Sequence, residues 1–374
     1  MHAVGEDGVG LLKFDFLGIK NLSILADAVE RVKKIEHEEI DIENIPLDNK
    51  KTFEMLARGE TIGLFQLNGS GMTKFLVELK PTVIHDINAM VALYRPGPLE
   101  SIPQYIERKH DANKIEYLDP RMKDILDMSY GVITYQDDVM MIAIKLGGYS
   151  WLEADKLRKA MGKKIPKEME EQKDKLIEGL VKNGKENGLN KRKADQIWKL
   201  IEPFAAYGFN KAHAASYGRV AYQTSYMKAN YPAIYMSAVL TAESGDVEKI
   251  AEIIGECKRM NIPILPPDIN ESFSQFTVIK ARPEGEKSSF AGQTTQSPSS
   301  GAFLSQQEAV SSRDTIRFGL VTIKNLGQGI STAIIEERKK GGHFKSLTDF
   351  LDRVKDKNLN KKSLEALTKA GALD

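Results

Sequence analysis

Apolar residues recur at helical spacing along most of the chain. Over residues 20–34 they include Leu22, Leu25, Val29 and Val32, which lie on one face of a helix. A second helix is predicted at 48–59, with Asp48 as its N-cap. Similar patterns predict helices at 70–78, 84–93, 101–108, 120–128, 136–146, 151–161, 167–187, 190–204, 213–229, 231–241 and 246–260. The pattern therefore predicts a mainly α-helical fold.

Two short segments near the N-terminus depart from this spacing. Residues 11–19 (LLKFDFLGI) have the pattern of a buried strand that carries two charges, and residues 60–67 (ETIGLFQL) that of a short strand or turn. A strand followed by a helix predicts a small αβ unit ahead of the helical region.

The composition changes after Asn261. The sequence PILPPDIN is predicted to be extended, and residues 273–279 and 315–321 are predicted strands. Between them, residues 284–314 are rich in Ser, Gln and Gly, which predicts a disordered insertion. Residues 322–374 have the pattern of two short helical units joined by glycine-containing hairpins. The last part of the chain is thus predicted to be a small strand-bearing helical module.

Composition excludes several classes of protein. The chain has 374 residues, 41% of them hydrophobic, which argues against large-scale disorder. It has no apolar run near the roughly 18 residues of a membrane span, so no membrane association is expected. The N-terminus lacks the pattern of a signal peptide. A single cysteine, Cys257, excludes an internal disulfide framework and fits a cytoplasmic location.

The formal charge of +1 conceals an uneven distribution. Residues 1–60 hold 8 basic and 13 acidic residues, whereas residues 151–230 hold 17 basic and 10 acidic residues. A surplus of +7 can form a surface that attracts phosphates, or it can be spread over solvated helix faces. Individual motifs have to distinguish these two possibilities.

Lys13 and Asp15 are two residues apart in the predicted strand, so their side chains point to the same face. They form either a neutralising pair or a phosphate-binding lysine beside a metal-binding carboxylate. A second candidate is Arg95 in the sequence YRPGPL, where Pro-Gly-Pro fixes a rigid turn after a helix. Arg95 there could bind an anion or cover the carbonyls at the end of the helix.

Four cations lie within seven residues at Arg158, Lys159, Lys163 and Lys164. Gly162 is predicted to break the helix between the two pairs, so that cations reach a triphosphate or a nucleic-acid backbone from different directions. A solvated run of charge at an exposed edge is the alternative.

The segment FNKAHAASYG predicts a helix that starts after an Asn210 N-cap. Lys211 and His213 near that helix start could meet an anion, although a single histidine is more often packed in the core. Tyr217 follows on the same helix and could stack on a base or belong to the core.

Near the C-terminus, the sequence IKNLGQGI places Lys324 beside a Gly327-x-Gly329 hairpin that opens a helix. Such a hairpin presents backbone N–H groups to a phosphate, as helix-hairpin-helix motifs do on DNA. Common catalytic signatures are missing from the sequence, among them Walker A, GxGxxG after a strand, HExxH and GxSxG.

Several of these segments, taken in order, resemble those of one family. They are LLKFDFLGIKNL, GLFQL, ALYRPGPL, YGVITYQDDVM, ADKLRKAMGKK, FAAYGFNKAHAASYG, YQTSYMKANYPA and ILPPDIN. They look like the bacterial C-family replicative DNA polymerases, the DNA polymerase III alpha subunits. The resemblance covers nearly all of the chain outside the Ser- and Gln-rich insertion.

The resemblance implies three domains: the C-terminal part of a polymerase-beta-like palm over 1–48, fingers over 49–245, and the start of a DNA-binding region with tandem helix-hairpin-helix motifs over 246–374. It implies that Asp15 is a metal-binding palm aspartate and that Lys13 contacts phosphate beside it. The implied nucleotide- and DNA-binding residues are Arg95, Arg158, Lys159, Lys163, Lys164, Lys211, His213, Lys324, Gly327 and Gly329.

The resemblance also implies template-directed DNA synthesis with two Mg²⁺ ions. The implied partners are primer–template DNA, a dNTP, the sliding clamp and other replisome subunits. The family's D-x-D aspartates, which lie well upstream of Asp15, have no counterpart here, so we expect a fragment without polymerase activity of its own. Two alternatives remain open: a non-catalytic DNA-binding module and an error-prone member of the same family.

Overall fold

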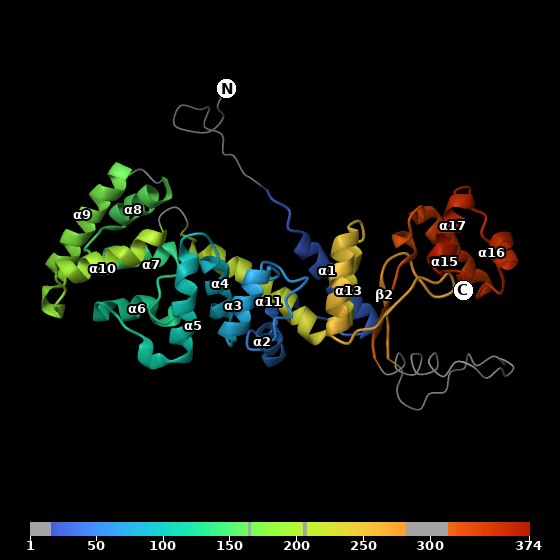
Figure 1. The fold of residues 1–374 in the computed structure, drawn as a ribbon, viewed down its shortest axis with the longest axis horizontal. Coiled ribbons are helices and arrows are strands. Elements are labelled where there is room, and N and C mark those ends of the chain that lie inside the picture. Colours follow the sequence, from blue (N-terminus) through green and yellow to red (C-terminus); the bar gives the residue numbers. More distant parts are fainter. Residues whose placement is uncertain (1–15, 164–165, 205–207, 282–312) are drawn as a thin grey trace, which may run out of the picture.

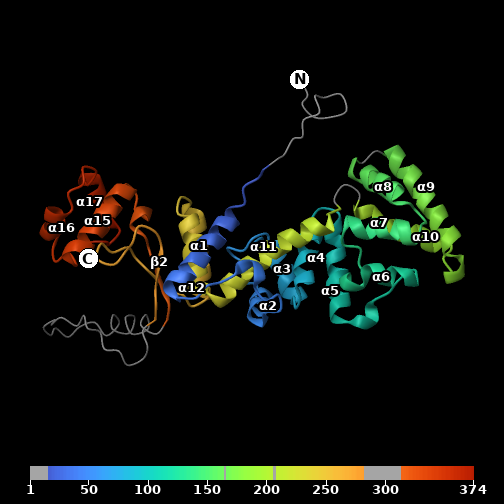
Figure 2. The same cartoon turned by 180° about the vertical axis from the view of Figure 1, so that it is seen from behind.

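The computed structural model describes residues 16–163, 166–204, 208–281 and 313–374. They form an elongated, predominantly helical molecule, with helices α8 (Trp151–Lys163), α9 (Pro166–Asn183) and α10 (Lys191–Ile201) at one end. The chain's C-terminal helices gather at the other end, as both views show (Figure 1, Figure 2). The predicted mainly α-helical fold is confirmed.

The remaining elements lie between and beside these ends. The other helices are α1 (Lys20–Ile35), α2 (Lys50–Ala57), α3 (Ser70–Leu79), α4 (Ile84–Leu93), α5 (Ile102–His110), α6 (Lys123–Leu126), α7 (Gln136–Lys145), α11 (Lys211–Asn230), α12 (Pro232–Ala242), α13 (Val247–Arg259), α15 (Gln328–Gly341), α16 (Leu347–Arg353) and α17 (Lys361–Lys369). The strands are β1 (Ile264–Leu265), β2 (Thr277–Ile279) and β3 (Thr315–Arg317). No helix in the part of the chain that the structure describes is long and apolar enough to cross a membrane.

Helices α11 and α12 form the centre of the main core. Helix α12 is apolar on all sides, and every residue from Ala233 to Leu240 is buried, because α1, α11, α13 and β2 pack around it. Helix α11 packs along α2 and α4. The long central helix therefore holds the N-terminal helices and the middle of the chain in one body.

Two basic side chains form hydrogen bonds that connect segments far apart in the sequence. Lys228 of α11 is fully buried and donates hydrogen bonds to the Glu60 and Ile62 carbonyls and to the Glu256 carboxylate of α13, the last at 2.5 Å. The Arg31 guanidinium of α1 donates to the Phe276 carbonyl at 2.6 Å and to hydroxyls of α12. These bonds satisfy charges that would otherwise be costly to bury.

The three short strands form one sheet in the order β1-β3-β2. Strand β3 pairs parallel with β1 and antiparallel with β2. The strands predicted at 273–279 and 315–321 are present, but they are shorter than predicted. Beyond β3 the chain turns at Gly319, where any side chain would overlap the backbone of Ser274 and Gln275, and a 3₁₀ turn at Leu320–Thr322 follows.

Several local expectations are wrong or fall outside the described residues. Asn49 caps α2, not Asp48, because the helix begins at Lys50 and the Asn49 side chain accepts from the Thr52 N–H at 3.0 Å. Residues 60–67 form turns, which is one of the two forms expected of them. Residues 16–19 are not in a strand, and the rest of the predicted 11–19 strand lies outside the described residues, as does the insertion except for Arg313 and Asp314.

Candidate nucleic-acid interface

The site begins with the close packing of α4 on α11. Gly218 of α11 lies against Asn88 of α4, where an added Cβ would overlap the Asn88 Oδ1 and approach its Cα to 3.3 Å. Only glycine allows the two helices to come this close. Because the helices run antiparallel, the end of α4, with Arg95 two residues beyond it, meets the start of α11.

A cation and a series of rings stack at this meeting point. The Arg95 guanidinium lies 3.8 Å from the centroid of the Phe209 ring. Edge-on and tilted ring contacts extend this stack from Phe209 to His213 at 4.9 Å, from His213 to Tyr217 at 4.4 Å, and from Tyr217 to Phe65 at 5.2 Å. Stacking of this kind fixes the plane of the guanidinium and leaves its edge available to an anion.

Arg95 has no counter-charge among the residues that the structure describes. Among the described residues no carboxylate pairs with it, and its buried Nε has no hydrogen-bond partner. Burial lowers the pKa of the Arg95 guanidinium, although it remains a cation at any physiological pH. A half-buried arginine without a carboxylate partner among the described residues favours an anionic ligand.

The start of α11 is already occupied by protein groups. Asn210 caps the helix, as predicted, by accepting from the His213 N–H at 3.0 Å. The Lys211 N–H donates to Asp137 of α7 at 2.8 Å. An anion at this end would therefore contact side chains and not the capped backbone N–H groups. One such side chain is Lys211, whose ammonium lies 5.6 Å from the Tyr135 ring centroid.

Helix α7 connects this end of α11 to the basic helix α8. The Gln136 N–H at the start of α7 donates to the Phe209 carbonyl at 3.0 Å, and α8 packs along α7. On α8, Arg158 and Lys159 both pair with Asp155, at 2.7 and 2.9 Å. Since exposed ion pairs contribute only about 0–1 kcal/mol, a phosphate could replace Asp155 as their partner.

The backbone between the two pairs of cations differs from the prediction. Gly162 does not break α8, because the helix continues through it to Lys163. The buried side chains of Leu157, Ala160 and Met161 hold this last turn in place. Lys164 lies outside the described residues, so convergence of the four cations stays a prediction.

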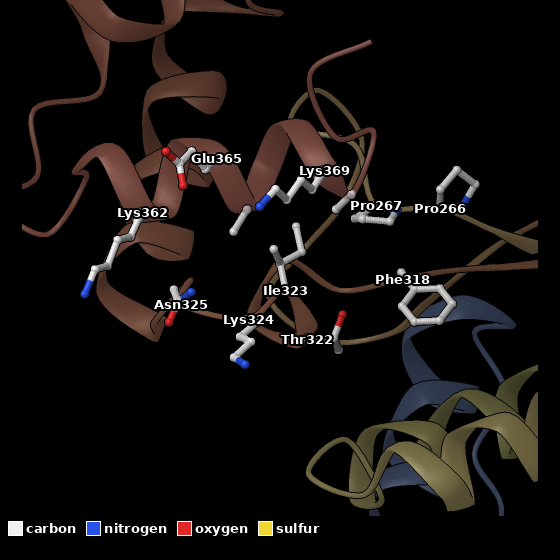
Figure 3. Close-up of a pocket in the computed structure, with 12 residues that line it drawn as sticks. Pro266, Pro267, Phe318, Thr322, Ile323, Lys324, Asn325, Lys362, Glu365 and Lys369 are labelled. Carbon is white, nitrogen blue, oxygen red and sulfur yellow. The ribbon is translucent and has the colours of Figure 1, made fainter.

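The C-terminal module supplies a second candidate contact. Gly327 is the N-cap of α15, has no side-chain cap, and has no atom within 4 Å of the position a Cβ would take. Among the described residues the N–H groups of the first turn therefore have no side-chain cap. Lys324, three residues before Gly327, is exposed (Figure 3). Helix α17 differs, because the Asn360 side chain accepts from the Lys362 and Ser363 N–H groups.

Lys13 and Asp15 lie outside the described residues. Within the described ranges, no group of three or more His, Cys, Asp or Glu side chains is placed to hold a metal ion. The structure adds Phe65, Tyr135 and Asp137 to the candidate residues, and all three fall in segments, GLFQL and YGVITYQDDVM, that carried the resemblance.

Comparisons with known proteins point to one family. Residues 21–184 match the bacterial DNA polymerase III alpha subunit finger domain, and residues 261–374 match a helix-hairpin-helix motif. The chain is 43% identical to the DNA polymerase III subunit alpha of Thermus aquaticus and 42% identical to that of Escherichia coli K12, in each case over 98% of its own length. It spans 28% and 29% of these two relatives. The chain belongs to the DNA polymerase III alpha subunit family.

Proposed function

We propose that this chain provides the nucleotide-binding fingers and a DNA-contacting module for template-directed DNA synthesis. In that reaction the primer 3′-hydroxyl attacks the α-phosphate of a dNTP, a new phosphodiester bond forms, and pyrophosphate leaves. The observation that carries the proposal is the unpaired Arg95 cation stacked on Phe209, where α4 meets α11.

The stack supports a role in holding the dNTP. Arg95 and Lys211 would neutralise the triphosphate, and His213 would be positioned by its stacking between Phe209 and Tyr217. Arg158 and Lys159, with Lys163 and Lys164 nearby in sequence, would contact phosphates of the nucleotide or the template. The Gly327–Gly329 hairpin with Lys324 would contact the backbone of the duplex at the other end of the molecule (Figure 1).

Asp15, with Lys13 beside it, is the residue that we propose for Mg²⁺. When bound, the metal would stabilise the charge that develops on the attacking and leaving oxygens. A two-metal site needs several carboxylates, so we propose that Asp15 acts with carboxylates outside this sequence. The same proposal includes domain limits at 48 and 245 and a cytoplasmic location. It also includes the sliding clamp and other replisome subunits as partners.

Reconstitution with a polypeptide that carries the upstream palm aspartates of a relative tests the proposal. The mixture should extend a primer in the presence of Mg²⁺, whereas this chain alone should only bind DNA. Asp15→Asn should abolish extension and leave DNA binding nearly intact. Undiminished turnover by the Asp15→Asn variant would remove Asp15 from the metal site.

A non-catalytic DNA-binding module is the second candidate function. The open N-terminus of α15 favours it, because this hairpin can contact DNA without any catalytic centre. The same reconstitution separates the two functions. Salt-dependent DNA binding without extension, even with the palm polypeptide present, would support the non-catalytic module.

A further inference from the structure

A pocket of about 730 Å³ lies in the C-terminal module, away from the Arg95 stack. Three parts of the chain form its walls: the Pro266–Pro267 segment after β1, the stretch from Phe318 to Asn325, and one face of α17 (Figure 3). Neither Gly327 nor Gly329 lines it. The pocket therefore does not include the hairpin N–H groups that are candidates for a phosphate contact, although Lys324 borders both.

The floor of the pocket is apolar. Ile323 is buried in the module's core, and half-buried Phe318 packs its ring on Phe276 with centroids 4.7 Å apart. Ala366 of α17 and Ala370, the residue that caps the end of this helix, are four residues apart and both line the pocket. Their short side chains leave open the space that larger residues would fill.

The rim of the pocket is basic. Lys324, Lys362 and Lys369 line it, all three are exposed, and none forms an ion pair within the described residues. The one acidic residue of the lining, Glu365, has only a distant partner, Lys361 at 4.0 Å. An apolar floor inside a charged rim is the usual arrangement of a site that binds a peptide or an organic ligand.

We propose that this pocket binds a short segment of a partner protein that places an apolar side chain on the floor and acidic residues against the three lysines. Charge complementarity with the rim favours an acidic segment. A nucleic-acid strand fits less well, because its phosphates gain nothing from the apolar floor and are repelled by Glu365. A peptide supplies both an apolar anchor and separate charges, and its N–H groups can donate to Glu365.

Selection from a phage-displayed library of random peptides tests the proposal on the full chain. Clones that also bind the Ala366→Trp variant are removed, because tryptophan fills the pocket without changing its charge. The remaining peptides should carry net negative charge and at least one large apolar residue. A synthetic peptide of the most enriched sequence should bind the Lys369→Glu variant at least about tenfold more weakly.

Lys339→Glu is the matched control, because Lys339 is exposed on α15 of the same module and does not line the pocket. It should bind the peptide within about twofold of the unaltered chain. Thermal unfolding followed by circular dichroism checks that each variant is folded. The proposal is overturned if no clone distinguishes Ala366→Trp or if the distinguishing peptides are basic.

Discussion

Gly218 of α11 packs directly on Asn88 of α4, and this contact brings Arg95 to Phe209. Gly218→Ala should therefore lower the free energy of unfolding by about 1–3 kcal/mol, because the new methyl group overlaps the Asn88 side chain. Chemical denaturation measures the change.

Gly255→Ala is the matched control for this substitution. Gly255 lies within α13, and no atom lies within 4 Å of its Cβ position. Alanine there should raise stability by about 0.5–1 kcal/mol, because it has the higher helix propensity. Equal stabilities of the two variants would show that the α4–α11 contact is not as close as described.

The second prediction concerns Asp138, whose Oδ2 accepts the Thr134 and Tyr135 N–H groups at 2.9 Å at the start of α7. Burial raises the pKa of Asp138 from 3.8 to about 6, against the opposing effects of these two N–H groups and of Lys211. Between these pH values the folded chain binds more protons than the unfolded chain. The stability that Asp138 contributes is thus complete below about pH 4 and is lost above about pH 6.

Asp138→Asn keeps an acceptor for the two N–H groups and removes the titration. As the pH rises from about 4 to about 6, the unaltered chain should lose up to about 3 kcal/mol relative to this variant. Urea denaturation across this range measures the difference. Asp349→Asn should give the opposite sign at lower pH, because the Lys345 N–H and Arg353 hold the pKa of Asp349 below its usual 3.8. The stability that Asp349 contributes is therefore complete above about pH 4 and is lost as the pH falls below it. Parallel pH profiles for all three proteins would refute the assignment.

The third prediction concerns the α15 hairpin. Lys324→Ala should weaken binding to duplex DNA by a similar factor for unrelated sequences and reduce the slope of log K against log salt by about 1. Fluorescence anisotropy at several salt concentrations measures both. Lys339→Ala, which removes the same charge from the other end of α15, should leave the slope unchanged. An equal loss of slope in both variants would mean that the hairpin makes no specific phosphate contact.

The sequence predicted local structure well where the signals are local. The helix predicted at 84–93 has the observed bounds of α4, and Asn210 caps α11 as expected. Asp48 and Asn49 are almost equally good caps, so the sequence could not choose between them. Gly162 fails as a helix breaker because a cost of about 1 kcal/mol is outweighed by the packing of its neighbours.

The partners of the site residues could not be predicted, because they come from other parts of the fold. Asp137 accepts a hydrogen bond from the Lys211 N–H, although the two residues are 74 positions apart in the sequence. Phe65 contacts the ring stack from the loop before α3. Asp155 lies three residues before Arg158 and four before Lys159. These ion pairs could therefore have been predicted from helical spacing. The apolar pocket beside Lys324 depends on how α17 packs, which sequence spacing does not show.

The most direct test of the central claim is the KM for dNTP of the reconstituted polymerase carrying Arg95→Lys. Lysine keeps the charge but cannot stack on Phe209 as a planar group, so the KM for dNTP should rise about tenfold. Arg192→Lys, the same change at an exposed position on α10, should have no effect. If Arg95→Lys leaves the KM for dNTP unchanged, the ring stack where α4 meets α11 does not bind the nucleotide.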